Sequence, residues 1–428
     1  MGRDDDTTGA QTRREFVTYG TALVAAGAVA GCAGDDGPTD APDGGSDGTG
    51  GGSNGTDGGS GGNDGGTEPD REEDKGTGTQ TRTATDSATP YSVTMEPVGE
   101  VTFDAVPEAW IAFCGEFADM GVALGQADGM TGIGGADRYY TGVYDELPGV
   151  SVDGEPLERH SEVRTKEQFY ELENDVHFYD PEMLINWFDW DQADVDEIAD
   201  NVGPFVGNLI FRRSDEWHDY RYYTLYEAFE KVATVFQERE RFEAFSELHD
   251  EFVADLQTQL PPAGERPNVF LTFEGTNEPE TFSPYRLNDR GTSKKQWRDL
   301  GVADALAGTG VENLSTENRG ELDYENLLEI DPDVLLIRGH ERKSATEFRD
   351  TVLAYMEDHP VGSELTAVQT GRVYRGGYLH QGPIHNLFLT ERAAKQLYPD
   401  TFGEVTGDAE LFDRQRVADI VTGAFREE

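Results

Sequence analysis

An amphipathic stretch near the middle of the chain constrains the fold more than any other feature. Between Leu225 and Leu260, apolar residues recur at three- and four-residue spacing, and neither Gly nor Pro interrupts them before Pro261. This periodicity predicts one helix with a single buried face. Its 36 residues would extend over about 50 Å at the usual helical rise. We therefore expect a rigid helix that connects two lobes and permits only small movements between them.

A sequence phrase that occurs twice indicates that the two lobes share one plan. "EQFYELENDVHF" begins at Glu167 and "ENLLEIDPDVLL" at Glu325, an offset of 158 residues (325 minus 167). Thr165 and Asp323 precede these segments and suit helix caps, so each phrase predicts a capped helix followed by a short strand. The identical pairs are Glu167/Glu325, Glu171/Glu329, Asp175/Asp333 and Val176/Val334. Capped helices that lead into strands also occur in any α/β protein, which is the simpler explanation.

A second pair of similar segments supports the duplication. "DMGVA" precedes the first phrase, and "DLGVA" precedes the second. Each half then has an apolar strand, a helix that ends in a Gly-Val turn, and the Glu-led helix and strand. The expected first strands are "GEVTFDAV" from Gly99 and "RPNVFLTF" from Arg266. The sequence thus predicts an α/β protein of two Rossmann-like lobes, residues 91–222 and 263–428, joined by a single long helix within 223–262.

The N-terminal region predicts an export signal, a lipid anchor and a tether. Paired arginines in "TRREFV" precede a short Ala/Gly-rich apolar stretch, as in a twin-arginine signal, although "MGRDDD" before them is acidic. "VAGC" ends at Cys32 and resembles a lipobox, so residues 1–31 would be removed and Cys32 lipidated. Residues 32–90 are rich in Gly, Asp and Thr and predict a disordered tether.

The charge and the cysteines narrow the class further. The net charge is −51, from 85 acidic and 34 basic residues, so no basic face is available for nucleic acid. Blanket acidity of this kind resembles halophilic proteins, in which high salt screens self-repulsion. Cys32 and Cys114 are the two cysteines. A disulfide between them stays open, but the apolar run around Cys114 indicates a small buried side chain.

These features together resemble the solute-binding lipoproteins of ABC importers, in the class with a long interlobe helix that captures iron–siderophore complexes, cobalamin or heme. The resemblance covers roughly residues 91–405. It is carried by "ENLLEIDPDVLLIRG" and, most specifically, by "TGRVYRGGYLHQGPIHNLFLTERAAKQLYPDTF". The counterpart "ENDVHFYDPEMLINW" departs from the pattern, because it lacks a proline at the position of Pro332.

The resemblance implies a monomeric, extracytoplasmic receptor on the outer face of the cell membrane that performs no chemistry. It implies an iron(III) chelate as ligand, no intrinsic cofactor, and an ABC permease with its ATPase as partner. In this family a glutamate that begins the corresponding helix of each lobe docks on the permease, which implies this role for Glu167 and Glu325. Helix capping alone is the alternative for both.

Open α/β sheets bind ligands beyond the carboxyl ends of their strands, where we expect arginines and broad rings for a bulky, anionic chelate. The candidates in the N-terminal lobe are Trp110, Arg138, Tyr139, Tyr140, Trp187, Trp190, Arg212 and Arg213. The candidates in the C-terminal lobe are Tyr285, Arg286, Arg338, His340, Tyr378 and His380. Each could instead be a core ring or a surface ion pair.

Other functions remain open at this point. A receptor for free Zn²⁺ or Mn²⁺ would need converging His and carboxylate ligands, and His340 and His380 could meet in the cleft. Cobalamin or heme is a second alternative. An extracellular hydrolase is a third, although the sequence has no GxSxG, phosphate-loop or zincin motif.

Overall fold

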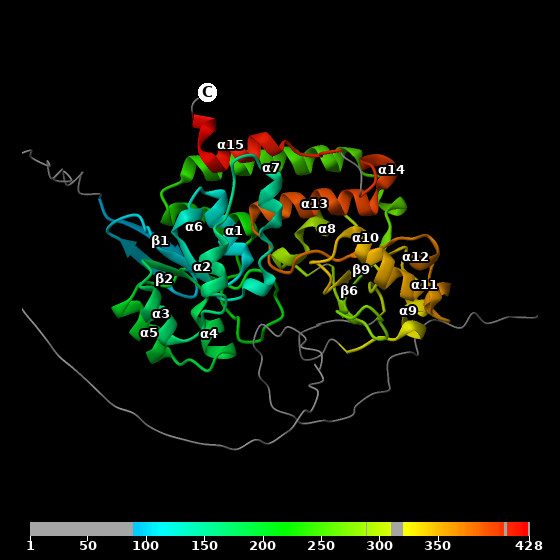
Figure 1. Ribbon diagram of the computed structural model, residues 1–428, viewed down its shortest axis with the longest axis horizontal. Helices are drawn as coiled ribbons and strands as arrows, with labels where there is room; N and C mark the ends of the chain where they lie inside the picture. The colour runs from blue at the N-terminus through cyan, green and yellow to red at the C-terminus, as the bar shows by residue number, and fades with distance from the viewer. Residues whose placement is uncertain (1–88, 288, 310–319, 406–408, 427–428) are drawn as a thin grey trace, which may run out of the picture. The chain divides into compact units, whose positions relative to one another are not determined.

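The computed structural model describes residues 89–287, 289–309, 320–405 and 409–426 (Figure 1). The predicted signal peptide, Cys32 and nearly all of the predicted tether lie outside these ranges. Within them, no helix combines the length and the apolar character that a bilayer crossing requires.

The first two strands form a small antiparallel sheet of their own. β1 (Tyr91–Met95) pairs with β2 (Gly99–Phe103), and Tyr91 lies opposite Phe103. The sequence led us to expect that "GEVTFDAV" is the first strand of the N-terminal parallel sheet. This expectation is wrong, because the segment belongs to the separate sheet of β1 and β2. Polar and apolar residues alternate in both strands, which suits a sheet with one buried and one exposed face.

The N-terminal parallel sheet consists of three short, buried strands in the order β4–β3–β5. They are β3 (Trp110–Ala112), β4 (Met130–Ile133) and β5 (Val176–Phe178). Helix α1 (Gly115–Ala123) follows β3, and its exclusively buried residues show that it lies inside the molecule. The other helices of this lobe are α2 (Gly154–Arg159), α3 (Lys166–Leu172), α4 (Pro181–Trp187) and α5 (Gln192–Asn201).

The C-terminal sheet has the order β10–β9–β6–β7, with β8 also pairing to β6. Only β7 is antiparallel to its neighbour. The strands are β6 (Asn268–Phe273), β7 (Ser283–Tyr285), β8 (Ala303–Asp304), β9 (Val334–Arg338) and β10 (Val373–Arg375). The helices are α8 (Lys295–Asp299), α9 (Tyr324–Ile330), α10 (Ala345–Phe348), α11 (Ala354–Asp358) and α12 (Thr366–Gln369). The predicted α/β class with two lobes is confirmed, while the exact lobe boundaries stay a prediction.

The repeated phrase folds in the same way in both lobes. Helices α3 and α9 have seven residues each, and both begin with a capping box. Each ends at an acidic residue in the left-handed conformation, Glu173 with φ 47° and Asp331 with φ 43°. A non-glycine residue in this conformation is uncommon, so its recurrence at the same offset reflects a shared local structure.

The aspartate that follows each helix makes an equivalent bond to the neighbouring strand segment. Asp175 accepts from the backbone N–H groups of Glu108 and Ala109, both at 2.9 Å. Asp333 accepts from the N–H of Asn268 at 2.8 Å. The valine after each aspartate is buried and pairs in parallel with the first strand of its sheet. The similar segments "DMGVA" and "DLGVA" differ more in structure. Helix α1 continues through Gly121 of the first segment, whereas α8 ends before Gly301 (φ +61°) of the second.

The predicted single connecting helix is wrong, because the chain divides it into two. Helix α6 (Leu225–Val235) and helix α7 (Arg239–Gln259) pack against each other, and Gln237 turns between them with φ 54°. Helix α7 remains the longer connection, about 31 Å by its 21 residues.

A second helix also joins the lobes. Helix α13 (Pro383–Leu397) runs beside α7 and contacts α1 of the first lobe and α8 of the second (Figure 1). Two more helices complete the described chain, α14 (Pro399–Phe402) and α15 (Arg414–Thr422), of which α15 lies along α7. The relation between the lobes therefore depends on two helices.

Candidate ligand site between the lobes

The segments that leave the carboxyl ends of β4 and β10 meet, as expected for two facing α/β lobes. The ring of Tyr140 stacks on that of Tyr378, with centroids 4.3 Å apart and planes 7° from parallel. The Arg342 guanidinium lies 5.4 Å from the centre of the Tyr140 ring and donates to the backbone carbonyl of Asp137 at 2.8 Å. Two predicted aromatic candidates thus touch across the lobes.

Backbone hydrogen bonds connect the lobes at a second place. The N–H of Thr292 donates to the carbonyl of Ile210 at 3.0 Å, and the N–H of Ser293 donates to that of Phe211 at 3.2 Å. These bonds bring the segment that carries Arg212 and Arg213 against the start of α8.

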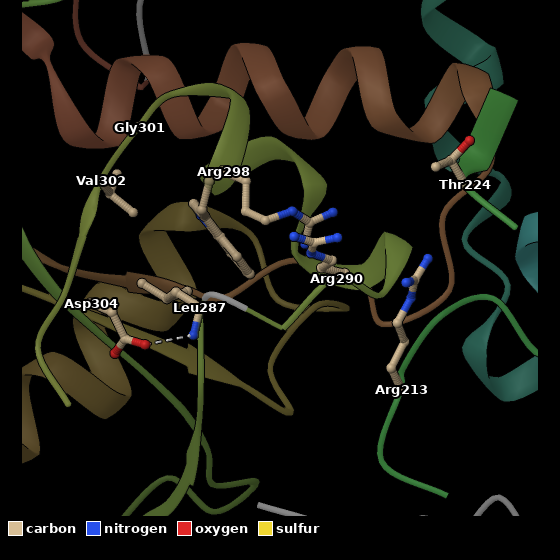
Figure 2. A pocket seen from close by; sticks show the side chains of 9 residues that line it. Arg213, Thr224, Leu287, Arg290, Arg298, Gly301, Val302 and Asp304 are labelled. Atoms are coloured by element: carbon tan, nitrogen blue, oxygen red, sulfur yellow. Dashed lines mark hydrogen bonds between the residues drawn. The ribbon is translucent and has the colours of Figure 1, made fainter. Parts of the chain in front are cut away.

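A cationic pocket of about 510 Å³ opens beside this contact (Figure 2). Arg290 and Arg298 reach it from the C-terminal lobe, and Arg213 reaches it from the segment before α6. The remaining lining residues are Thr224, Leu287, Trp297, Gly301, Val302 and Asp304. The volume falls within the range of small-molecule sites. Trp297 forms part of the wall, although only 2% of the residue is exposed.

The one carboxylate that lines the pocket is already engaged. Asp304 forms an ion pair with Arg286 at 2.9 Å and accepts from the N–H of Leu287 at 3.1 Å. Arg298 is held by the backbone carbonyls of Asp289 and Gly291, at 2.5 and 2.9 Å. Carbonyl groups fix a guanidinium without neutralising its charge, so the pocket keeps a positive field.

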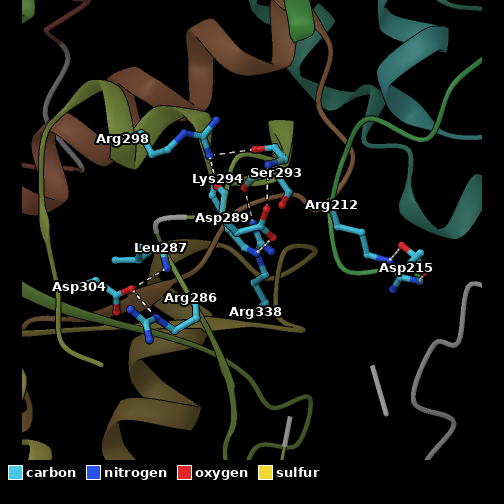
Figure 3. Close-up of polar contacts among 11 residues, drawn as sticks. Arg212, Asp215, Arg286, Leu287, Asp289, Ser293, Lys294, Arg298, Asp304 and Arg338 are labelled. Carbon is cyan, nitrogen blue, oxygen red and sulfur yellow. Dashed lines mark hydrogen bonds and ion pairs between the residues drawn. The ribbon is translucent and has the colours of Figure 1, made fainter. Parts of the chain in front are cut away.

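Lys294 and Arg338 form a second group of cations close to the pocket residue Arg298 (Figure 3). Arg338, only 3% exposed at the end of β9, donates to the carbonyl of Ser293 at 2.5 Å. Its guanidinium also lies over the rings of Trp297 and Tyr285. Burial lowers the pKa of Arg338, and it lowers that of Lys294 to about 8 despite an ion pair with Asp289 at 2.6 Å. Arg338 therefore supports the wall formed by Trp297.

A buried polar network crosses the lobe contact at α1 and α13. The Tyr139 hydroxyl lies 2.8 Å from that of Tyr144, which donates to Asp119 at 2.7 Å. The other Asp119 oxygen accepts from the backbone N–H of His385 at 3.0 Å. Burial raises the pKa of Asp119, and the hydrogen bonds oppose that rise. Tyr139 thus belongs to the lobe contact and not to an open ligand surface.

The structure moves several predicted residues out of the pocket. Trp110 is fully buried because it begins β3, and its ring packs beneath α1 against Phe178 and Phe236. Trp190 is a core ring whose indole N–H donates to the carbonyl of Arg164 at 2.9 Å. Neither residue lines the pocket.

Predicted arginines are divided between ion pairs and open positions. Arg212 lies over the Trp187 ring at 4.8 Å and pairs with Asp215 at 2.5 Å. Arg286 pairs with Asp304, as described above, and Arg138 lies 3.6 Å from Asp137. Of the predicted arginines, only Arg213 lines the pocket.

The two predicted cleft histidines lie in different surroundings. The Nδ1 atom of His340 lies 2.8 Å from the ammonium of Lys343, and burial lowers the pKa of His340 to about 4. His380 instead bonds to Glu116 at 2.7 Å. The two histidines share no partner among the described residues, so a metal site that combines them is not supported.

Arg213 is the one pocket residue among the predicted candidates, so the other eight lining residues were missed. Three of these eight, Arg290, Trp297 and Arg298, supply positive charge or an aromatic ring. They lie in "RGTSKKQWRDL", a segment that contributed no candidate. A usable signal was present, because four basic residues occur within nine positions of a strongly acidic chain. They are Arg290, Lys294, Lys295 and Arg298.

Two facing α/β lobes, joined by long helices and enclosing a cationic pocket, define the class of two-lobed binding proteins. The family comparison agrees. The family model described as "Periplasmic binding protein" matches residues 115–377. The chain therefore belongs to the periplasmic binding protein family, whose members bind substrates outside the cytoplasm for ABC importers and are not enzymes. No curated protein matches the sequence.

Solved structures of similar fold differ widely in sequence. A periplasmic binding protein from Veillonella parvula has a TM-score of 0.51 and 16% identity, over 72% of this chain and 97% of its own. The iron uptake ABC transporter substrate-binding protein PiuA from Streptococcus pneumoniae has a TM-score of 0.51 and 18% identity, over 73% and 100%. The petrobactin-binding protein YclQ from Bacillus subtilis has a TM-score of 0.50 and 14% identity, over 72% and 99%. At such identities the likeness shows the fold alone.

Proposed function

We propose that the protein is the substrate-binding component of an ABC import system and captures an anionic metal chelate, of which a ferric siderophore is the expected class. The observation that carries the proposal is the convergence of Arg213, Arg290 and Arg298 on one pocket in a chain of net charge −51. An acidic surface repels anions, so a local cationic pocket is needed for an anionic cargo. The similar structures PiuA, an iron uptake protein, and YclQ, a petrobactin-binding protein, support the same cargo class.

The pocket chemistry favours a pre-formed chelate over the other cargoes. Its nine lining residues include no His, Cys, Met or Tyr, so they offer no usual axial ligand to heme iron. Free Zn²⁺ or Mn²⁺ would face three guanidinium groups and a single, already paired carboxylate. A chelator that has saturated its iron needs neither kind of ligand, because its charge and rings supply the contacts.

We also propose that the protein docks on an ABC permease and is anchored to the membrane. Glu167 and Glu325 each lie in the first turn of an equivalent helix, and both are exposed without an ion pair to a described residue. This placement supports one docking carboxylate per lobe for a permease that works with an ATPase. We also propose that the protein is a monomer anchored at the outer face of the membrane through Cys32. A single lipid chain binds only marginally, so the anchor would carry more than one.

Fluorescence titration of the full-length protein at high salt tests the cargo, because Trp297 lines the pocket. The probes are ferric catecholates, ferric hydroxamates, heme, cobalamin and Zn²⁺. We expect saturable quenching by an anionic ferric catecholate. Trp297→Phe should remove most of the quenching while calorimetry still detects binding. Saturation by heme or cobalamin alone would replace the cargo class, and no response to any probe would contradict the proposed function.

A further inference from the structure

A second chemically distinct cluster lies at the lobe contact and shares no residue with the cationic pocket. One ligand atom each from Cys114, Glu116 and His380 lies within 4.8 Å of the other two. All three side chains are buried, with residue exposures of 1%, 3% and 0%. Neither the family nor the proposed cargo site accounts for a thiol, a carboxylate and an imidazole that converge in the interior.

The fold brings these residues together from opposite lobes. Cys114 is the N-cap of α1 and Glu116 lies in the first turn of that helix. His380 comes from the segment between β10 and α13, 264 residues further along the chain than Glu116. Both residues of α1 therefore lie at the amino-terminal end of that helix. The cluster is thus built by the closed arrangement of the two lobes.

The donor set determines which cation would fit. Sulfur, imidazole nitrogen and carboxylate oxygen together suit a borderline divalent ion such as Zn²⁺ better than the hard ions Mg²⁺ and Ca²⁺. Two anionic ligands would neutralise the charge of such an ion, which is a condition for burying it. Three protein ligands leave a further coordination position, as in zinc sites that keep an open position.

The hydrogen bonding around His380 is incomplete. Its Nδ1 atom lies 2.7 Å from Glu116 Oε2, while its Nε2 atom is buried without a hydrogen-bond partner. Buried imidazoles normally use both nitrogens, so the histidine retains binding capacity that the lobe contact does not use.

We propose that Cys114, Glu116 and His380 form a binding site for one Zn²⁺-like cation that links the two lobes. The ion would bind Glu116, His380 and the thiolate together. Because its ligands converge only in the folded, closed protein, the bound ion stabilises this state. The site is separate from cargo capture, so its test does not depend on the identity of the chelate.

Co²⁺ is the probe that separates this site from adventitious binding by surface acids. A thiolate ligand gives Co²⁺ an intense sulfur-to-metal charge-transfer absorption, which carboxylates do not give. The chain has two cysteines, so the full-length protein carries Cys32→Ser throughout and Cys114 is the only thiol. We expect one equivalent of Co²⁺ to give the charge-transfer band at high salt, and Zn²⁺ to displace it.

Matched variants identify the ligands. His380→Gln should weaken Zn²⁺ binding at least tenfold, and Cys114→Ala should abolish the charge-transfer band. His340→Gln is the control, because it replaces another buried histidine whose Nε2 has no hydrogen-bond partner and lies 3.9 Å from Glu274. It should leave the band and the affinity unchanged. Circular dichroism of each metal-free variant checks that the fold is retained.

If Co²⁺ binds without the band, or if Cys114→Ala retains full affinity, the cation occupies surface carboxylates and the proposal is overturned. Equal losses in His380→Gln and His340→Gln would overturn it as well. Should Cys114→Ala not fold, Cys114→Ser together with the unchanged His380 comparison decides the question, because a hydroxyl fills the space but gives no thiolate band.

Discussion

Replacing Arg213 with Gln should weaken binding of an anionic ferric catecholate while leaving the fold stable. Arg213 lines the pocket and lies 4.9 Å from the centre of the Tyr222 ring. Its Nε atom is buried without a hydrogen-bond partner, and no described carboxylate pairs with its guanidinium. Glutamine keeps a polar side chain but is shorter than arginine and carries no charge. The salt dependence of the loss therefore separates the effect of charge from that of shape.

The structure sets the size of the expected loss. A hydrogen bond between charged groups contributes about 1.5–3 kcal/mol, which corresponds to roughly a 10- to 150-fold change in affinity. A full unit-charge attraction at 4 Å and an effective dielectric constant of 20 gives about 4 kcal/mol, which is the upper bound. The fold should lose only the ring contact, about 0.5–1 kcal/mol. Affinity should therefore fall far more than the free energy of unfolding.

Arg212→Gln is the matched control, because Arg212 is the neighbouring residue and its guanidinium is already paired with Asp215. Both variants are titrated with the ferric catecholate at several salt concentrations, and both are unfolded with guanidinium chloride. The Arg213 effect should shrink as salt rises, because screening weakens the attraction. Equal losses in the two variants, or no loss in Arg213→Gln, would refute the assignment of this pocket.

Four further outcomes are expected. Changing both Glu167 and Glu325 to Ala should abolish uptake in cells and leave ligand affinity intact; lost affinity would instead make them structural or cleft residues. Cys32→Ser should release the protein into the medium, and continued membrane retention would contradict the lipid anchor. Gly121→Ala would place a Cβ 2.4 Å from the indole ring beneath α1 and should reduce the free energy of unfolding by about 1–3 kcal/mol in denaturant titrations. Burial lowers the pKa of His177 to about 3. Between about pH 6.5 and pH 3, this histidine is therefore protonated in the unfolded chain but not in the folded protein. As the pH falls from about 6.5 to about 3, this residue should lower the free energy of unfolding by about 1.4 kcal/mol per pH unit. In denaturant titrations over this pH range, His177→Phe should reduce the slope of the free energy of unfolding against pH by that amount.

The repeated phrase shows what the sequence could predict well. Each copy combines a cap, an apolar stripe, an aspartate and a buried valine, and all of these act within a few residues of each other. Local chemistry of this kind determines local structure. The helix-and-strand unit could therefore be predicted from the amino-acid sequence alone. The two-lobe α/β class then followed from its duplication.

The broken connecting helix shows where local reasoning failed. Gln237 adopts a left-handed conformation although nothing in its residue type favours it. The tertiary structure supplies the reason, because α6 folds back against α7. One sign was available, since the apolar stripe pauses between Phe236 and Phe242.

The candidate site was harder to predict than the fold, because it depends on which strand a residue belongs to. Trp110 was expected just beyond the first strand, and it proved to be the beginning of the next one. Arg298 was not among the candidates, and only the packing of α8 directs it into the pocket. The spacing of residues along the sequence does not show which side chains from distant segments meet in the folded protein.

The hydrogen bond from the His385 N–H to Asp119 also bears on the order in which the protein is made. It joins residues 266 positions apart, and α13 covers the buried face of α1. During synthesis, the first lobe emerges long before the helix that completes its interior. Contacts of such sequence separation slow folding and leave apolar surface exposed in the meantime. The N-terminal lobe therefore reaches its final state only after the ribosome has added α13, and a chain cut before that helix would leave α1 open to proteases.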